Sequence, residues 1–160
     1  MDDIKLDIRK VSTEAEKMIC ANIMASTEPW ITLGINYDKL MNTINDSLNE
    51  VFVAYVQKEI IGTIIIQTKG AFSGYLKSIA IKTNWQDKHL GKIMMKFLEE
   101  EIFSEHTNVF LCVSSFNLAA KRFYLKLGYE VIGEIKNYLV KGQDEILMRK
   151  TIGPILENAG

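Results

Sequence analysis

The sequence predicts an α/β domain of the α+β kind, with a mixed central sheet of about seven strands flanked by about four helices. Three observations predict this class. Segments with strand-like alternation or short apolar runs recur along the chain, and amphipathic helical segments separate several of them. Both hairpin-like turns and strand–helix–strand connections are present. Hairpins join antiparallel strands and crossovers join parallel ones, so the sheet is expected to be mixed.

The length and composition fit one globular domain without an obvious partner. The 160 residues are enough to bury a full core. A hydrophobic content of 48% and a charged content of 24% exclude disordered and collagen-like chains. With 19 basic and 20 acidic side chains, the net charge of -1 offers no global attraction for a nucleic acid or an anionic membrane. We therefore expect neither partner, and any function must come from local features.

The cysteines, histidines and terminus exclude several other classes. Cys20 and Cys112 lie far apart without a C-x-x-C pair and are expected to be reduced thiols. The two histidines, His89 and His106, form no metal site at usual spacings, so no metal is expected. The N-terminus lacks the pattern of a signal peptide, and no apolar run approaches the ~20 residues of a membrane span. A cytoplasmic protein is the resulting expectation.

The elements of the N-terminal third can be assigned in order. Alternation over residues 4–8 indicates a half-buried strand. Ser12-Thr13-x-x-Glu16 is a capping-box pattern that starts a helix running to about residue 25. Residues 26–36 are expected to form a loop, and residues 37–48 a helix with one apolar face.

The remaining elements alternate between strands and helices. Gly62 marks a possible bulge in the second strand of a hairpin, and residues 70–74 form a turn. The crossover through the first helix of this region should be right-handed and parallel. Strands are expected at 50–56, 60–67, 75–81, 109–113, 129–135 and 145–149, and helices from near Leu90 and over 117–127. The domain is expected to span 1–152, with 153–160 a loose tail.

The polar loop at residues 82–91 has the properties of an anion site. It joins the end of a buried strand to a helix N-terminus, whose free amides and dipole attract a phosphate group. Lys88 and Lys92 add positive charge, and Gly91 permits close approach to the backbone. The alternative is an ordinary connection with solvated lysines. The loop lacks the glycines of a P-loop and of a dinucleotide fingerprint.

A second segment has the features of a well-delimited helix. Asn117 is a good N-cap and Gly128 a good terminator. Tyr124 follows Asn117 by nearly two turns, so the two side chains can lie along one edge of the helix.

Both segments resemble the signatures of one family. Gln86-x-x-His89-x-Gly91 is similar to the Q/R-x-x-G-x-G/A loop of the GNAT superfamily of acetyl-CoA-dependent N-acetyltransferases. The second signature, N-x-x-A-x-x-F/L-Y-x-x-x-G-F/Y, is matched at Asn117, Ala120, Phe123, Tyr124, Gly128 and Tyr129. The resemblance covers residues 50–150 well, and the N-terminal third by element order. His89 departs from the family's glycine, which matters if that position needs a positive φ, and Asp87 places a carboxylate where many relatives have glycine.

The resemblance implies a GNAT-like fold whose fourth and fifth strands splay near Ile81 and Val113. It implies that acetyl-CoA is the co-substrate and that Asn117 and Tyr124 flank its arm. The pantetheine arm would pair with the strand backbone, and the pyrophosphate would sit on the loop amides. The residues so implied are Ile79, Ala80, Ile81, Gln86, Asp87, Lys88, His89, Leu90, Gly91 and Lys92. An acceptor amine would attack the thioester directly, so neither cysteine needs a nucleophilic role.

Tyr124 is our choice of general acid for the leaving thiolate, because a phenol is neutral at pH 7. The alternative is a core tyrosine with a hydrogen-bonded hydroxyl. Glu28 is a candidate base or amine binder, and otherwise an exposed turn residue. Trp30 either lines the acceptor pocket or packs the loop onto the sheet. Tyr138 or a water chain are further possibilities for the base.

The expected function is an N-acetyltransferase acting on a small amine or a peptide N-terminus. Relatives that acetylate ribosomal-protein N-termini tend to carry Glu after the first Leu of the fifth strand, where this chain has Cys112, so a ribosomal substrate is in doubt. The alternative is a non-catalytic acyl-CoA-binding module on the same fold, and a pure interaction domain has no positive support. A homodimer is a further implication of the resemblance.

Overall fold

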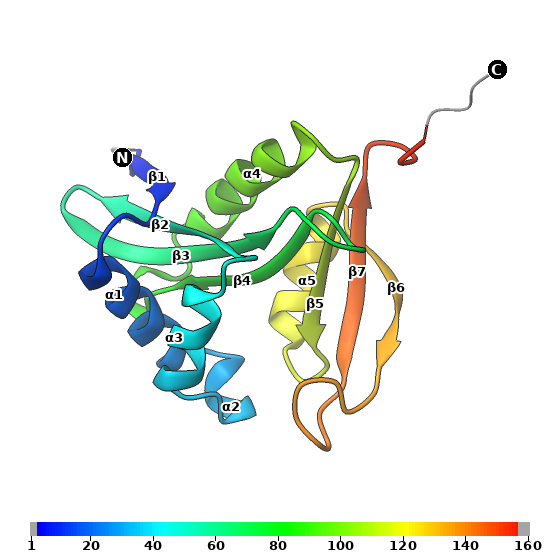
Figure 1. Cartoon of the computed structure of the whole chain (residues 1–160), viewed down its shortest axis with the longest axis horizontal. Coiled ribbons are helices and arrows are strands. Elements are labelled where there is room, and N and C mark those ends of the chain that lie inside the picture. Colours follow the sequence, from blue (N-terminus) through cyan, green and yellow to red (C-terminus); the bar gives the residue numbers. More distant parts are fainter. Residues whose placement is uncertain (1–2, 157–160) are drawn as a thin grey trace.

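The computed structural model describes residues 3–156. Its strands are β1 (Leu6–Lys10), β2 (Glu50–Val56), β3 (Glu59–Gln67), β4 (Tyr75–Ile81), β5 (Asn108–Ser114), β6 (Glu130–Ile135) and β7 (Glu145–Thr151). Its helices are α1 (Glu14–Ala25), α2 (Trp30–Leu33), α3 (Tyr37–Asn45), α4 (Leu90–Phe103) and α5 (Leu118–Lys126), with a 3-10 turn η1 (Thr83–Trp85). The strands form one sheet in the order β1-β2-β3-β4-β5-β7-β6 (Figure 1). The pair β4 and β5 is parallel and the other five pairs are antiparallel, which confirms the predicted mixed sheet.

Apart from shifts of one or two residues at other ends, the structure differs from the sequence prediction in three places. The expected loop at residues 26–36 contains α2, closed by Gly34 in the left-handed region with φ 68°. Four helical residues are too few to show an amphipathic period, so no helix could be predicted there from the sequence. The helix α3 ends at Asn45 rather than residue 48, because Asp46 turns extended and its side chain accepts from the amide of Leu48 at 2.9 Å. The first strand begins at Leu6 rather than residue 4, and residues 157–160 of the predicted tail lie outside the described part of the chain.

The helices cover both faces of the sheet (Figure 1), with α1, α2 and α3 on one side and α4 and α5 on the other. Strand β2 shows why both faces must be apolar. Val51 and Val53 pack with the α1 and α3 side chains, whereas Phe52 and Ala54 pack with those of α4. A strand buried on both faces has a continuous apolar run rather than a clean alternation.

The predicted bulge lies in the β2–β3 hairpin. Ala54 pairs with Gly62 and Tyr55 with Ile60, so Ile61 is the extra residue. A Cβ at Gly62 would lie 2.7 Å from the carbonyl oxygen of Ala80 in β4, so the neighbouring strand also requires glycine there.

The splay of β4 and β5 creates an opening in the sheet, along which the cavities described below lie. The two strands pair only at Tyr75 with Phe110 and Leu76 with Leu111. Figure 1 shows the half of the sheet that ends in β4 diverging from the half formed by β5, β7 and β6. From residue 77 onward, the edge of β4 that faces β5 has no strand partner among the described residues.

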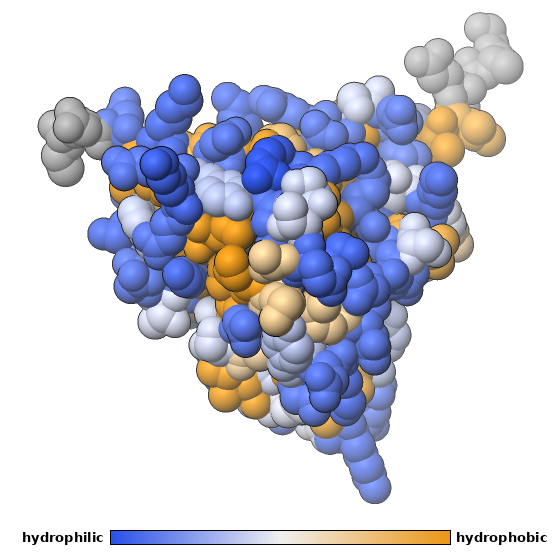
Figure 2. Space-filling view, turned by 60° about the vertical axis from the view of Figure 1, so that its left-hand side comes forward, coloured by the Kyte–Doolittle hydropathy of each residue, from blue (hydrophilic) through white to orange (hydrophobic). Residues whose placement is uncertain are grey.

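The surface is mixed in character. Figure 2 shows one face with apolar atoms gathered in its middle and hydrophilic atoms around them. Over residues 3–156, the helices are all too short or too polar to traverse a bilayer.

Candidate functional site

Three adjoining cavities follow the opening between β4 and β5. The central cleft, of about 170 Å³, is bounded by β4, β5, α5 and residues 28–30. The loop pocket, of about 650 Å³, lies against the end of β4, the loop before α4 and the α5 side chains. The aromatic pocket, of about 540 Å³, is bounded by α2, residues 69–72, Tyr75, Tyr138 and Glu145. Tyr124 borders both the central cleft and the loop pocket, and Trp30 borders both the central cleft and the aromatic pocket.

The loop pocket brings together most of the predicted cofactor-binding residues. Tyr124 and Glu28 also line it. Lys88 does not, and its ammonium lies 6.0 Å from the centre of the Trp85 ring. The predicted residues found there are Ile79, Ala80, Ile81, Gln86, Asp87, His89, Leu90, Gly91 and Lys92.

The backbone before α4 has the conformation that the motif suggested. Asp87 and His89 both have positive φ, at 60° and 61°, so the position at which the family has glycine does require the left-handed region here. His89 is the N-cap of α4 and its side chain makes no capping hydrogen bond. The first amides of α4 are therefore not satisfied by a side-chain cap, which favours an anion at this end of the helix. The side chain of Gln86 fastens the loop by donating to the carbonyl oxygen of Ile81 at 3.0 Å.

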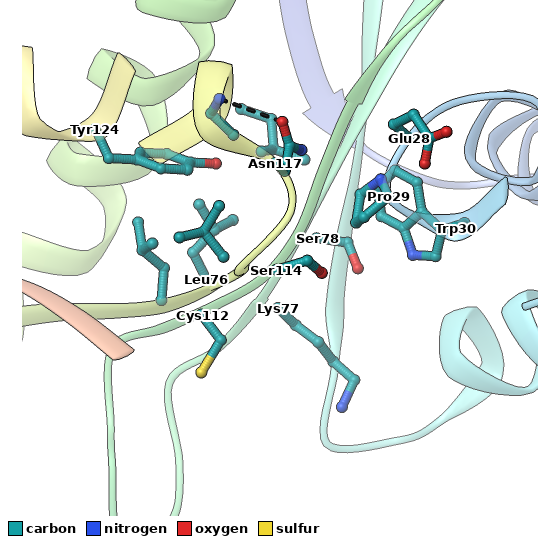
Figure 3. Close-up of a pocket in the computed structure, with 14 residues that line it drawn as sticks. Glu28, Pro29, Trp30, Leu76, Lys77, Ser78, Cys112, Ser114, Asn117 and Tyr124 are labelled. Atoms are coloured by element: carbon teal, nitrogen blue, oxygen red, sulfur yellow. Dashed lines mark hydrogen bonds between the residues drawn. The ribbon is translucent and has the colours of Figure 1, made fainter. Parts of the chain in front are cut away.

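Helix α5 places two predicted residues on the central cleft. Asn117 caps the helix, since its side-chain oxygen accepts from the amide of Ala120 at 3.3 Å. Tyr124 is only 8% exposed, and its hydroxyl points toward the cleft (Figure 3). Within residues 3–156 that hydroxyl has no hydrogen-bond partner, unlike the bonded core tyrosine of the alternative interpretation. Burial raises the pKa of Tyr124 above its ordinary value, so the phenol stays protonated at neutral pH.

The segment before α2 faces Tyr124 across the cleft (Figure 3). Glu28 is exposed, and its carboxylate accepts from the amide and hydroxyl of Thr32 at 3.2 and 2.8 Å. These contacts are those of an exposed turn residue, which was the alternative to Glu28 acting as a base. Trp30 is buried and lines two cavities, so it both packs the segment and forms a wall.

Sequence reasoning missed a polar group at the end of β5. Glu145, the first residue of β7, is opposite Ser114 in the β5–β7 ladder and is only 3% exposed. Its Oε2 and the Ser114 hydroxyl are both buried without a hydrogen-bond partner among the described residues. Burial raises the pKa of Glu145. No local motif marks this glutamate, because only the strand register brings it to the aromatic pocket.

Tyr138, a further candidate for the base, also lines the aromatic pocket. Both cysteines are free, with Cys20 buried and Cys112 partly exposed beside the cavities. Between residues 3 and 156, no group of three or more His, Cys, Asp or Glu side chains is arranged to hold a metal ion.

Comparison with known proteins gives consistent matches. Residues 17–129 match the model of the acetyltransferase (GNAT) family. An uncharacterized N-acetyltransferase of Methanocaldococcus jannaschii is 29% identical over 101 residues, a match that spans 62% of this chain and 64% of that relative's length.

Two solved structures show the same fold. A GNAT-family protein from Desulfovibrio desulfuricans has a TM-score of 0.78 with 16% identity over 93% of this chain and 100% of its own. An aminoglycoside 6'-N-acetyltransferase complexed with coenzyme A has a TM-score of 0.74 with 19% identity over 94% of this chain and 99% of its own. The family model covers well over half of the chain and includes both signatures completely. One explanation therefore accounts for the splayed β4–β5 pair, the loop before α4 and the Asn117–Tyr129 segment. This chain belongs to the GNAT acetyltransferase family.

Proposed function

We propose that this protein is an N-acetyltransferase that moves an acetyl group from acetyl-CoA to a primary amine within a ternary complex. The observation that carries the proposal is the position of Tyr124, a buried residue whose unbonded hydroxyl faces the central cleft between two larger cavities. One cavity would hold each substrate, and the reacting atoms would meet in the cleft.

The loop pocket fits acetyl-CoA. The uncapped N-terminus of α4 and the side chain of Lys92 would receive the pyrophosphate, and the unpaired edge of β4 would pair with the pantetheine amides. The GNAT-fold aminoglycoside acetyltransferase was solved with coenzyme A, which supports the same co-substrate here. Asn117 positions Tyr124 by capping its helix.

The chemistry is a direct acyl transfer. The amine nitrogen forms a bond to the thioester carbon, the C–S bond breaks, and the electron pair leaves with sulfur. Tyr124 protonates that sulfur and is reprotonated from solvent. The acceptor nitrogen loses one proton when the ammonium becomes an amine and a second when the C–N bond forms. The thiol of CoA keeps one of these two protons in the overall balance, so one proton is released. An amide of β4 near Ile81 is the proposed donor to the tetrahedral oxyanion.

The first test is whether the cofactor binds. Acetyl-CoA at a hundredfold excess over its Kd should stabilise the fold by about 2.7 kcal/mol, seen as a rise in Tm. Absence of any shift with acetyl-CoA or CoA at millimolar concentration would refute both the enzyme and the alternative of a non-catalytic acyl-CoA-binding module.

The second test is Tyr124→Phe, assayed by thiol release over an amine panel. We expect kcat to fall by about a hundredfold, within the range of general acid catalysis, with the Kd for acetyl-CoA nearly unchanged. Tyr37→Phe is a matched control, since it removes the same hydroxyl from a tyrosine that lines none of the three cavities. Equal rates for wild type and Tyr124→Phe would remove Tyr124 from the mechanism.

A further inference from the structure

The aromatic pocket has a distinctive set of walls. Its volume of about 540 Å³ lies inside the usual range for small-molecule sites. Four aromatic side chains line it: Trp30, Phe72, Tyr75 and Tyr138. Aromatic faces receive an apolar body and also attract an ammonium group.

Among residues 3–156, Glu145 is the only acidic residue that lines this pocket. The residue is almost fully buried, and its Oε2 lacks a hydrogen-bond partner within the described chain. A buried carboxylate without a partner is unfavourable, and a cationic ligand that pairs with it relieves that cost. Glu28, the acid predicted from sequence, does not line the aromatic pocket and is already bonded to Thr32.

Two lysines set a limit on the charge of the ligand. Lys69 and Lys77 both line the aromatic pocket, and neither takes part in an ion pair within residues 3–156. Glu145 can pair with one positive charge, and a second or third charge on the ligand would meet the exposed ammonium groups of Lys69 and Lys77. Like charges placed together in an interface are strongly unfavourable.

We propose that Glu145 first receives the ammonium group of the acceptor, whose nitrogen then enters the adjoining central cleft as the neutral amine, and that this acceptor is a small monoamine with an aromatic or aliphatic body, not a polycation. This inference rests on the proposed function and narrows its substrate class. The carboxylate attracts the single charge, the aromatic walls receive the body, and the lysines select against polyamines and aminoglycosides.

The substrate class is tested by comparing kcat/KM for phenethylamine, spermidine, kanamycin and a short peptide with a free N-terminus. We expect phenethylamine to exceed each of the other three at least tenfold. A polyamine, aminoglycoside or peptide used equally well or better would overturn the assignment. If another amine is preferred but its turnover still falls in Tyr124→Phe, only the substrate class fails; if no amine is turned over, the proposed function fails.

The role of Glu145 is tested with Glu145→Gln. We expect the acceptor KM to rise at least tenfold while the KM for acetyl-CoA stays unchanged. Calorimetry with phenethylamine and CoA, which cannot react, should show a matching loss of amine affinity. Glu134→Gln, an exposed glutamate on β6 outside all three cavities, is the matched control. An unchanged KM in Glu145→Gln, or a larger effect from Glu28→Gln, would overturn the role of Glu145.

Discussion

His89 shows how a single residue can depart from a motif and still keep its conformation. Its φ of 61° lies in the left-handed region, which glycine adopts freely and other residues adopt at a cost of about 1 kcal/mol. Histidine is among the side chains that tolerate this region best. The loop therefore keeps its shape without the family's glycine, and the price is conformational strain beside the loop pocket.

Replacing His89 by Gly should relieve that strain. We expect the Kd for acetyl-CoA to fall about two- to threefold, because the loop reaches its bound conformation more easily. Calorimetry on both proteins measures the change. Gln57→Gly is the matched control, since Gln57 also has a positive φ, of 55°, but lies in the β2–β3 turn away from the loop pocket. An equal change in affinity from both variants, or none from His89→Gly, would contradict the interpretation.

Residues also differ in how far the sequence could identify them. Tyr124 and Asn117 were predictable because they lie seven positions apart on one short helix, and local periodicity fixes their relation. Glu145 was not predictable, because its environment comes from strand β5, thirty-one positions earlier in the chain, and from α2 and residues 69–72.

At the scale of elements, the junction before β4 decides where the splay begins. Gly74 has a φ of 93°, and its carbonyl accepts from the amide of Phe110 in β5 at 2.9 Å. A Cβ at Gly74 would lie only 2.2 Å from the carbonyl oxygen of Asn108. The two strands can meet at this end only because glycine leaves that space empty.

Gly74→Ala should therefore destabilise the fold strongly. We expect a loss of about 3 kcal/mol in the free energy of unfolding, from backbone strain and the displaced β5 backbone together. Urea denaturation measures it. Gly70→Ala separates the two causes, because Gly70 has a similar φ of 104° but nothing within 4 Å of its Cβ, and should lose only about 1 kcal/mol. Equal losses in the two variants would show that contact with β5 does not matter.

At the scale of the whole molecule, Glu16 joins the N-terminal helix to the edge of the sheet. Its carboxylate receives Arg9 of β1 at 2.8 Å and the Tyr55 hydroxyl of β2 at 3.0 Å, and it completes the capping box with Thr13. Burial by itself would raise the pKa of Glu16, but hydrogen bonds from Ser12, Arg9 and Tyr55 outweigh it and lower the pKa to about 2.

A lowered pKa makes this carboxylate stabilising only while it is ionised. Its contribution should be complete above pH 4.5, the ordinary value, and should disappear as the pH falls toward about 2. The shift corresponds to about 3 kcal/mol. Urea denaturation at intervals between pH 5 and pH 2 should show a steeper loss for wild type than for Glu16→Gln, while Glu14→Gln, an exposed residue in the same helical turn, should follow wild type. Parallel curves for wild type and Glu16→Gln would contradict the assignment.

The sequence by itself determined the fold class, the order of the elements and the helix that carries Tyr124. These follow from periodicity, caps and turns, which act between residues that are close in the chain. The tertiary structure alone decided the short helix α2, the engagement of Glu28 with Thr32 and the position of Glu145. The first two are local, but four or five residues are too few to show a period in the sequence. The position of Glu145 depends on where strands distant in sequence are brought together, and the end of the pairing between β4 and β5 sets where the cavities open.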